Sequence, residues 1–140
     1  MNGVENIHSG KKLIAVVFRN SIKVSGVKFF TESKNPFQIG IHQRPKGLSL
    51  APHVHKLDRP LIIDTIQEIL LVQKGKIKIT FYPKKGKIIT VKILDLGDSV
   101  LLMDGGHGVE FLENSRVFEV KQGPYPGSRF AKKYINDKSQ

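Results

Sequence analysis

Four side chains of this chain are of the types that bind transition metals. His53 and His55 are separated by one residue, so on a β-strand they would point to the same face. Glu68 lies in an apolar segment that ends before Gly75, and His107 lies in a glycine-rich stretch between two apolar segments. Three neutral imidazoles and one carboxylate suit a divalent transition metal. We therefore expect a site for Fe, Mn, Ni or Zn with these four side chains as ligands.

Each expected ligand also has a simpler interpretation. The first two histidines can be ordinary strand residues, Glu68 can lie on a partly solvated strand face, and His107 can be a polar residue of a glycine-rich turn. Glu68 shares its predicted strand face with Leu70 and Val72. A carboxylate among apolar side chains is costly unless a cation or hydrogen bonds hold it. This cost favours a bound partner for Glu68.

Three further residues are candidates for catalysis. His42 and Arg44 lie on the polar side of an alternating segment at 37–44. If that side faces a ligand, His42 can transfer protons and Arg44 can bind an anion. Glu119, like Lys121, alternates with apolar neighbours and can point inward, where its carboxylate would be an alternative base. An exposed strand face is an equal alternative for His42 and Arg44, and a surface pair is the simpler explanation for Glu119 and Lys121.

The composition limits the class of protein. The chain has 140 residues and no cysteine, which predicts one domain over residues 1–140 without disulfides or thiolate ligands. Such a composition is typical of a reducing compartment, so we expect a cytoplasmic protein. Residues 1–12 are polar, unlike a signal peptide, and no later segment is apolar over the length of a membrane span.

The net charge favours anionic ligands. Lys and Arg number 23 against 12 Asp and Glu, a formal charge of +11, which attracts phosphates, nucleotides, nucleic acid or acidic sugars. The lysines are spread through turn segments and do not alternate with aromatic side chains. We therefore rank nucleic-acid binding last and expect a small anionic ligand.

The apolar pattern has a period of two residues in many short segments, which predicts an all-β protein of sandwich or barrel type. The clearest hairpin joins 76–82 to 88–94, and 128–135 is expected to form a terminal helical turn before a frayed tail at 136–140. Segment 13–19 is apolar enough to need a partner as an edge strand, so we expect a homodimer. The predicted strands are 13–19, 26–31, 37–43, 52–56, 66–73, 76–82, 88–94, 99–103, 107–112 and 116–121.

The spacing of the expected ligands resembles the first motif of the cupins, which are small jelly-roll barrels also called double-stranded β-helices. Gly47, His53, His55, Glu68 and Gly75 match this motif over residues 47–75. The segment between the histidines and the glutamate, 56–67, is longer than is usual in the family, and we expect it to add an extended arm or lid.

A second cupin motif is matched in part over residues 97–111. Gly97 and Gly105 correspond to it. In contrast, His107 comes one residue early, Met103 stands where proline is usual and Phe111 stands where asparagine would follow the histidine. The resemblance covers about residues 37–121 and is similar to the small cupins found beside sugar and surface-polysaccharide enzymes. It implies a jelly-roll barrel in which His107 is the fourth metal ligand.

The expected metal site also suggests a function. A metal that polarises a carbonyl would assist enolisation of an anionic sugar-type ligand, so the chain is expected to be a sugar or nucleotide-sugar isomerase or epimerase. In this view His42 or Glu119 moves the proton and Arg44 holds the anion. Some cupins resembling this one use a histidine base without metal. The alternative is a carbohydrate-binding cupin that is not an enzyme, which remains open because no dedicated nucleophile is visible.

Overall fold

A computed structural model describes residues 2–135 of the chain. These residues divide into two compact units: unit 1 contains the described residues up to Ile22 and from Thr65 onward, and unit 2 is Lys23–Asp64. The all-β prediction is confirmed, since the only helix in this described range is the short α1 (Ser128–Ala131). A single domain over 1–140 stays a prediction, and the expected tail at 136–140 lies outside the described residues.

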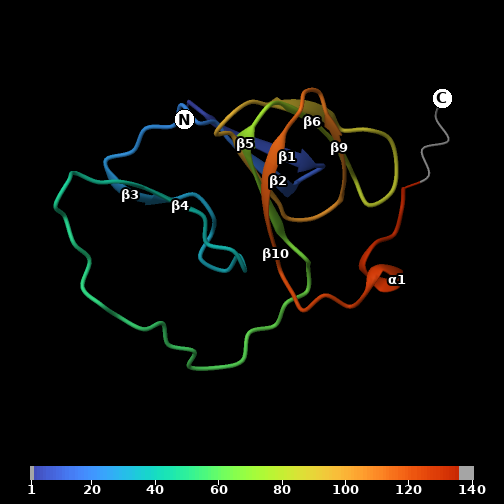
Figure 1. Cartoon of the computed structure of the whole chain (residues 1–140). Coiled ribbons are helices and arrows are strands. Elements are labelled where there is room, and N and C mark those ends of the chain that lie inside the picture. Colours follow the sequence, from blue (N-terminus) through green and yellow to red (C-terminus); the bar gives the residue numbers. More distant parts are fainter. Residues whose placement is uncertain (1, 136–140) are drawn as a thin grey trace. The chain divides into compact units, whose positions relative to one another are not determined.

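Unit 1 is built from two antiparallel sheets. The larger sheet has the order β1-β2-β8-β5-β10 and the smaller one β7-β6-β9; Figure 1 shows β5 beside β10 and β6 beside β9. The described pairings leave β1 and β10 as edges of one sheet and β7 and β9 as edges of the other, an arrangement consistent with an open sandwich. The strands are β1 (Val4–Ser9), β2 (Lys12–Phe18), β5 (Glu68–Lys74), β6 (Ile77–Tyr82), β7 (Thr90–Leu94), β8 (Ser99–Leu102), β9 (Gly106–Phe111) and β10 (Arg116–Lys121).

The hydrophobic core of unit 1 lies between these two sheets. Strand β6 contributes Ile77, Ile79 and Phe81, which are at most 1% exposed, while the residues between them are partly exposed. This alternation is the predicted one, and the predicted hairpin is confirmed because β6 pairs with β7 in antiparallel register. The larger sheet supplies the opposite side of the core through Ile7, Ile14, Ala15, Val17, Leu70, Val72, Val100 and Leu102.

Strand β2 lies inside the larger sheet and not at its edge. It pairs with β1 on one side and with β8 on the other, so the prediction that segment 13–19 is an edge strand is wrong. The edge is β1, which the sequence analysis missed because Glu5, Asn6 and His8 make this strand polar. The expectation of a homodimer therefore loses its original argument, and it stays a prediction.

A buried carboxylate fixes the turn between β7 and β8. The Asp98 side chain is 9% exposed and accepts a hydrogen bond of 2.9 Å from Nη1 of Arg19. It also accepts hydrogen bonds from the backbone nitrogens of Asn20 and Asp95. Arg19 donates from Nε to Glu5 as well, and this bond is the main reason why the pKa of Arg19 is raised. The ends of β1, β2 and β7 are thus tied to one turn.

Unit 2 contains a single hairpin, in which β3 (Gly26–Phe29) pairs with β4 (Gly40–Gln43). The predicted strand at 52–56 is wrong, since residues 44–67 contain no strand. Proline explains this in part, because Pro45, Pro52 and Pro60 cannot donate a backbone hydrogen bond to a neighbouring strand.

We predict that Gly75→Ala destabilises the protein more than Gly10→Ala. Both glycines have a positive φ, +78° and +59°, but a Cβ at Gly75 would lie 2.6 Å from the carbonyl oxygen of Asn114, whereas nothing lies within 4 Å at Gly10. We expect a loss of about 1 kcal/mol for Gly10→Ala from backbone strain alone and about 3 kcal/mol for Gly75→Ala from strain plus overpacking. Urea unfolding measures both values, and equal losses would contradict the steric argument.

Candidate functional site

Glu68 lies on the inner face of the larger sheet, at the first residue of β5. The next inward side chains of this strand, Leu70 and Val72, are 5% and 1% exposed and belong to the core. The Glu68 side chain itself is 13% exposed. A carboxylate in this row needs a compensating charge or hydrogen bonds.

His107 of the smaller sheet provides the first of these partners. His107 lies on β9 and is paired with Phe81 on the adjacent strand β6. Because paired residues of antiparallel strands point to the same face and Phe81 is in the core, the His107 side chain points to the core side of the sheet. Nε2 of His107 lies 3.2 Å from Oε1 of Glu68, and the imidazole side chain is 33% exposed. The pair joins the two sheets at the end of the sandwich where β5 begins. Among residues 2–135, none forms a hydrogen bond with Nδ1 of His107, which is left to face a ligand.

Lys121 provides the second partner. Lys121 lies on β10 and is paired with Glu68 on the adjacent strand β5. Its Nζ lies 3.4 Å from Oε2 of Glu68 and 2.8 Å from Oε1 of Glu119. The bond to Glu119, followed by the charge of Glu68, raises the pKa of Lys121 above its usual value, although burial opposes this. We refer to Glu68, His107, Glu119 and Lys121 as the Glu68 cluster.

The surroundings of Glu68 keep its carboxylate ionised. Burial is the largest single influence and raises the pKa of Glu68, but the hydrogen bond from His107 and the charges of His107 and Lys121 together outweigh it. The pKa of Glu68 therefore lies below its ordinary value. The carboxylate can then orient the imidazole and stabilise its protonated form.

The Glu68 cluster contains groups of both charges around one imidazole. With a neutral imidazole, two carboxylates and one ammonium leave one net negative charge. When His107 accepts a proton, the cluster becomes neutral. This arrangement is suited to general acid–base catalysis, in which a positioned side chain takes a proton from a substrate and returns it.

The four predicted metal ligands are divided between the two units. Glu68 and His107 meet in unit 1. His53 and His55 lie in the strand-free part of unit 2, where their rings contact each other edge to face with centroids 5.2 Å apart. His53 also bonds through Nδ1 to the carbonyl oxygen of Ala51 at 2.9 Å.

The fit of a metal ion can be judged within unit 1. Glu68 and His107 offer one oxygen and one nitrogen donor, and Lys121 lies against the second oxygen of Glu68. Within residues 2–135, no three His, Asp or Glu side chains gather closely enough to hold a metal ion. Unit 1 thus supplies two donors, and the site with four ligands stays a prediction.

The predicted catalytic residues are divided in the same way. Glu119 belongs to the Glu68 cluster. His42 lies on β4 opposite Val27, and Arg44 follows this strand and borders a hollow of about 560 Å³ at the open end of the hairpin in unit 2. The roles of His42 in proton transfer and of Arg44 in anion binding stay predictions.

Comparisons of the chain with protein-family models, with curated protein sequences and with solved structures return no match. In the described part of the chain, none of the helical residues form a segment with the length and apolar character needed to cross a membrane.

The sequence analysis missed a group of charged side chains in unit 1. Lys12 and Lys84 both form ion pairs with Asp104, although the chain segments that carry them are far apart in sequence. The pairing of β2 with β8 and of β6 with β9 brings these residues near one another. No local sequence pattern predicts those pairings.

The lowered pKa of Glu68 predicts a change of stability in acid. A carboxylate with a lowered folded-state pKa stabilises the fold above its unfolded pKa, here 4.5, and this contribution is lost as the pH falls through the folded value. The unfolding free energy of the wild type minus that of Glu68→Gln should therefore decrease between about pH 5 and about pH 3.

Glu113→Gln is the matched control for this measurement by urea unfolding. Its side chain is 55% exposed, and its oxygen lies 3.7 Å from Nζ of Lys76, so solvent screens this carboxylate and the same difference should be small throughout this pH range. A constant difference for Glu68→Gln as well would show that Glu68 is not held in its ionised form.

Proposed function

We propose that the protein is a cupin-like isomerase or epimerase that moves a proton on a small anionic sugar-type ligand, with His107 as the general base. The observation that carries the proposal is the 3.2 Å contact between His107 and the largely buried Glu68. This carboxylate fixes the ring and compensates the charge that the ring acquires. The open Nδ1 edge is where the proton would be taken.

The proposed reaction is proton transfer next to a carbonyl group. Nδ1 of His107 takes the proton from carbon, the C–H electron pair forms the enolate, and the negative charge moves to the carbonyl oxygen. Return of the proton to the former carbonyl carbon gives the isomer when the hydroxyl proton on the first carbon moves to the former carbonyl oxygen, whereas delivery of a proton to the opposite face of the first carbon gives the epimer. Lys121 lies within the Glu68 cluster and can stabilise the enolate oxygen electrostatically.

A divalent metal is the alternative means of stabilising the enolate. When bound, such an ion polarises the carbonyl oxygen. Glu68 and His107 would contribute donors from unit 1, and His53 and His55 would have to contribute theirs from unit 2. If Nδ1 of His107, the nitrogen that does not contact Glu68, held the ion, it could not also take a proton, so the two forms of the site can be distinguished by experiment.

The proposed function is tested by hydrogen exchange. We expect at least one keto-sugar, sugar phosphate or nucleotide sugar to exchange the hydrogen next to its carbonyl group in D₂O, measured by ¹H NMR. His107→Gln should slow this exchange by about 10²- to 10⁴-fold. The control His8→Gln changes an exposed histidine of β1 and should have no effect. Saturable binding without exchange across the panel would assign the protein to the class of binding modules instead.

The role of a metal is tested on the same assay after exhaustive chelation. We expect exchange to survive, because the base and its orienting carboxylate both belong to unit 1. A site with four ligands would give the opposite result. Chelation would then abolish exchange, and elemental analysis would find one divalent ion per chain. The double variant His53→Ala/His55→Ala would lose this ion, and so would Glu68→Gln.

A further inference from the structure

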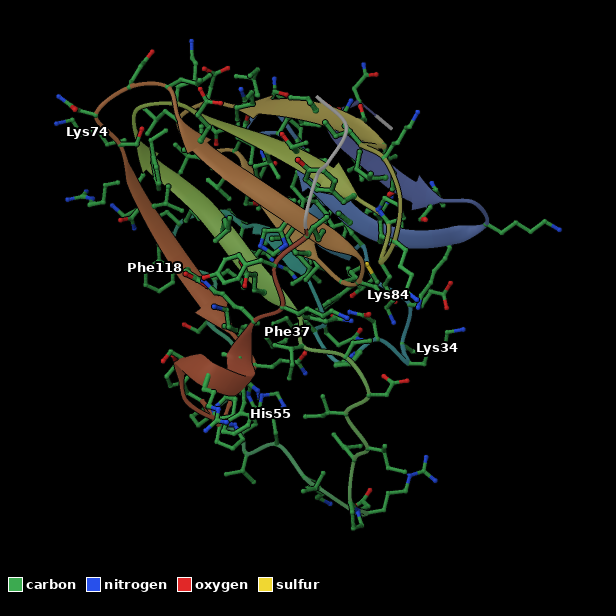
Figure 2. The ribbon with its side chains drawn as sticks, turned by 90° about the vertical axis from the view of Figure 1, so that its right-hand side faces the viewer. Lys34, Phe37, His55, Lys74, Lys84 and Phe118 are labelled. Carbon is green, nitrogen blue, oxygen red and sulfur yellow. The ribbon has the colours of Figure 1, made fainter. Side chains whose placement is uncertain are left out.

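A second polar site lies in unit 1 where three turns meet. A hollow of about 310 Å³ is bordered by the turn between β1 and β2, the loop between β6 and β7, and the turn between β8 and β9. Figure 2 shows Lys84, from the loop after β6, at the end of the strands opposite Lys74. The residues that line the hollow are Ser9, Lys12, Ile14, Pro83, Lys84, Lys85, Asp104 and Gly105. We refer to it as the lysine hollow.

Asp104 organises the charged side of the lysine hollow. Its side chain is 9% exposed and contacts the ammonium groups of Lys12 and, at 3.4 Å, Lys84. Its other interaction is a 2.7 Å hydrogen bond that Oδ1 accepts from the backbone nitrogen of Gly105. The carboxylate is therefore fixed in place, and it directs two ammonium groups toward the same hollow.

The lysine hollow carries an excess of positive charge. Three lysines against one aspartate leave two net positive charges, and Lys85 forms no ion pair with any of residues 2–135. A phosphate group carries between about one and a half and two negative charges at neutral pH and offers strong acceptor oxygens. The charges of the hollow and of a phosphate group are thus complementary.

The hollow also has an apolar part. Ile14 and Pro83 contribute to its lining, and neither can bond to a phosphate oxygen. The volume of about 310 Å³ exceeds the needs of a single tetrahedral anion and lies at the lower end of the range for small-molecule sites, roughly 300–1,000 Å³. These features favour a phosphate attached to a small organic group over the free ion.

We propose that the lysine hollow binds a phosphate group, and that its preferred ligand is a phosphate ester of a small organic molecule. The site uses neither Glu68 nor His107, so it stands independently of the proposed function. Both sites nevertheless lie at the same end of the sandwich, since Leu102 pairs with Glu68 on one side and with Ala15 of β2 on the other. Strands β2 and β5 are two strand spacings apart, about 10 Å.

The proposal is tested by titrating ¹⁵N-labelled protein at constant ionic strength with inorganic phosphate, ribose 5-phosphate and uncharged ribose. We expect both phosphates to shift the amide signals of Gly105 and of the loop after β6, with tighter binding of the ester and no binding of ribose. Equal affinities for the two phosphates would support the site and assign it to the free ion. No shifts with either phosphate at millimolar concentration would overturn the proposal.

Two single variants separate a specific site from general attraction by a basic protein. Lys85→Ala should weaken phosphate binding by about tenfold, since a charge-assisted hydrogen bond is lost. Lys74→Ala removes the same charge at the opposite end of the strands and should leave the affinity unchanged. An equal loss in both variants would show that net charge alone attracts the anion, and the proposal would fail.

Discussion

The alternation of side chains along β5 is the constraint on which the described site depends. Because successive residues of a strand point to opposite faces, Leu70 and Val72 can enter the core only if Glu68 points to the same side. The carboxylate is then compensated by two neighbours that the strand order supplies, His107 from the facing sheet and Lys121 from the adjacent strand. Core packing and site chemistry are therefore consequences of the same register.

The balance of forces at Glu68 differs from that at Asp98, another acidic group that unit 1 holds close to its core. Asp98 is compensated by an arginine and by the backbone nitrogens of Asn20 and Asp95, which together engage both of its oxygens. Glu68 is compensated by an imidazole that keeps a free nitrogen and by an amine shared with Glu119. The first arrangement is typical of a structural anchor, and the second is suited to proton transfer.

Much of the β-structure of unit 1 could be predicted because its signal is local. The alternation in 76–82 and the turn residues after it define the hairpin of β6 and β7. The placement of Glu119 and Lys121 on one strand face follows from the same period of two. The segment around His53 and His55 shows the limit of this argument. Spacing alone cannot show whether a neighbouring strand exists to pair with the segment, and in the structure none does.

The candidate site was predictable only where a single strand determined it. The inward position of Glu68 follows from its own strand, whereas its contact with His107 depends on how two sheets pack. The lysine hollow depends on three turns from distant parts of the chain, and Lys84 and Lys85 have the local character of a solvated turn. A short sequence window contains no information about such a meeting of turns.

Unit 2 enters the chain as one continuous insertion between β2 and β5, and none of its residues belongs to the core cluster of unit 1. The entropy lost on closing a flexible loop grows only with the logarithm of its length, so doubling such an insertion costs about 0.6 kcal/mol. The thermodynamic penalty for lengthening, trimming or replacing Lys23–Asp64 is thus small compared with that for altering a core strand. The length and sequence of this segment can therefore diverge during evolution while the sandwich that carries Glu68 is inherited unchanged.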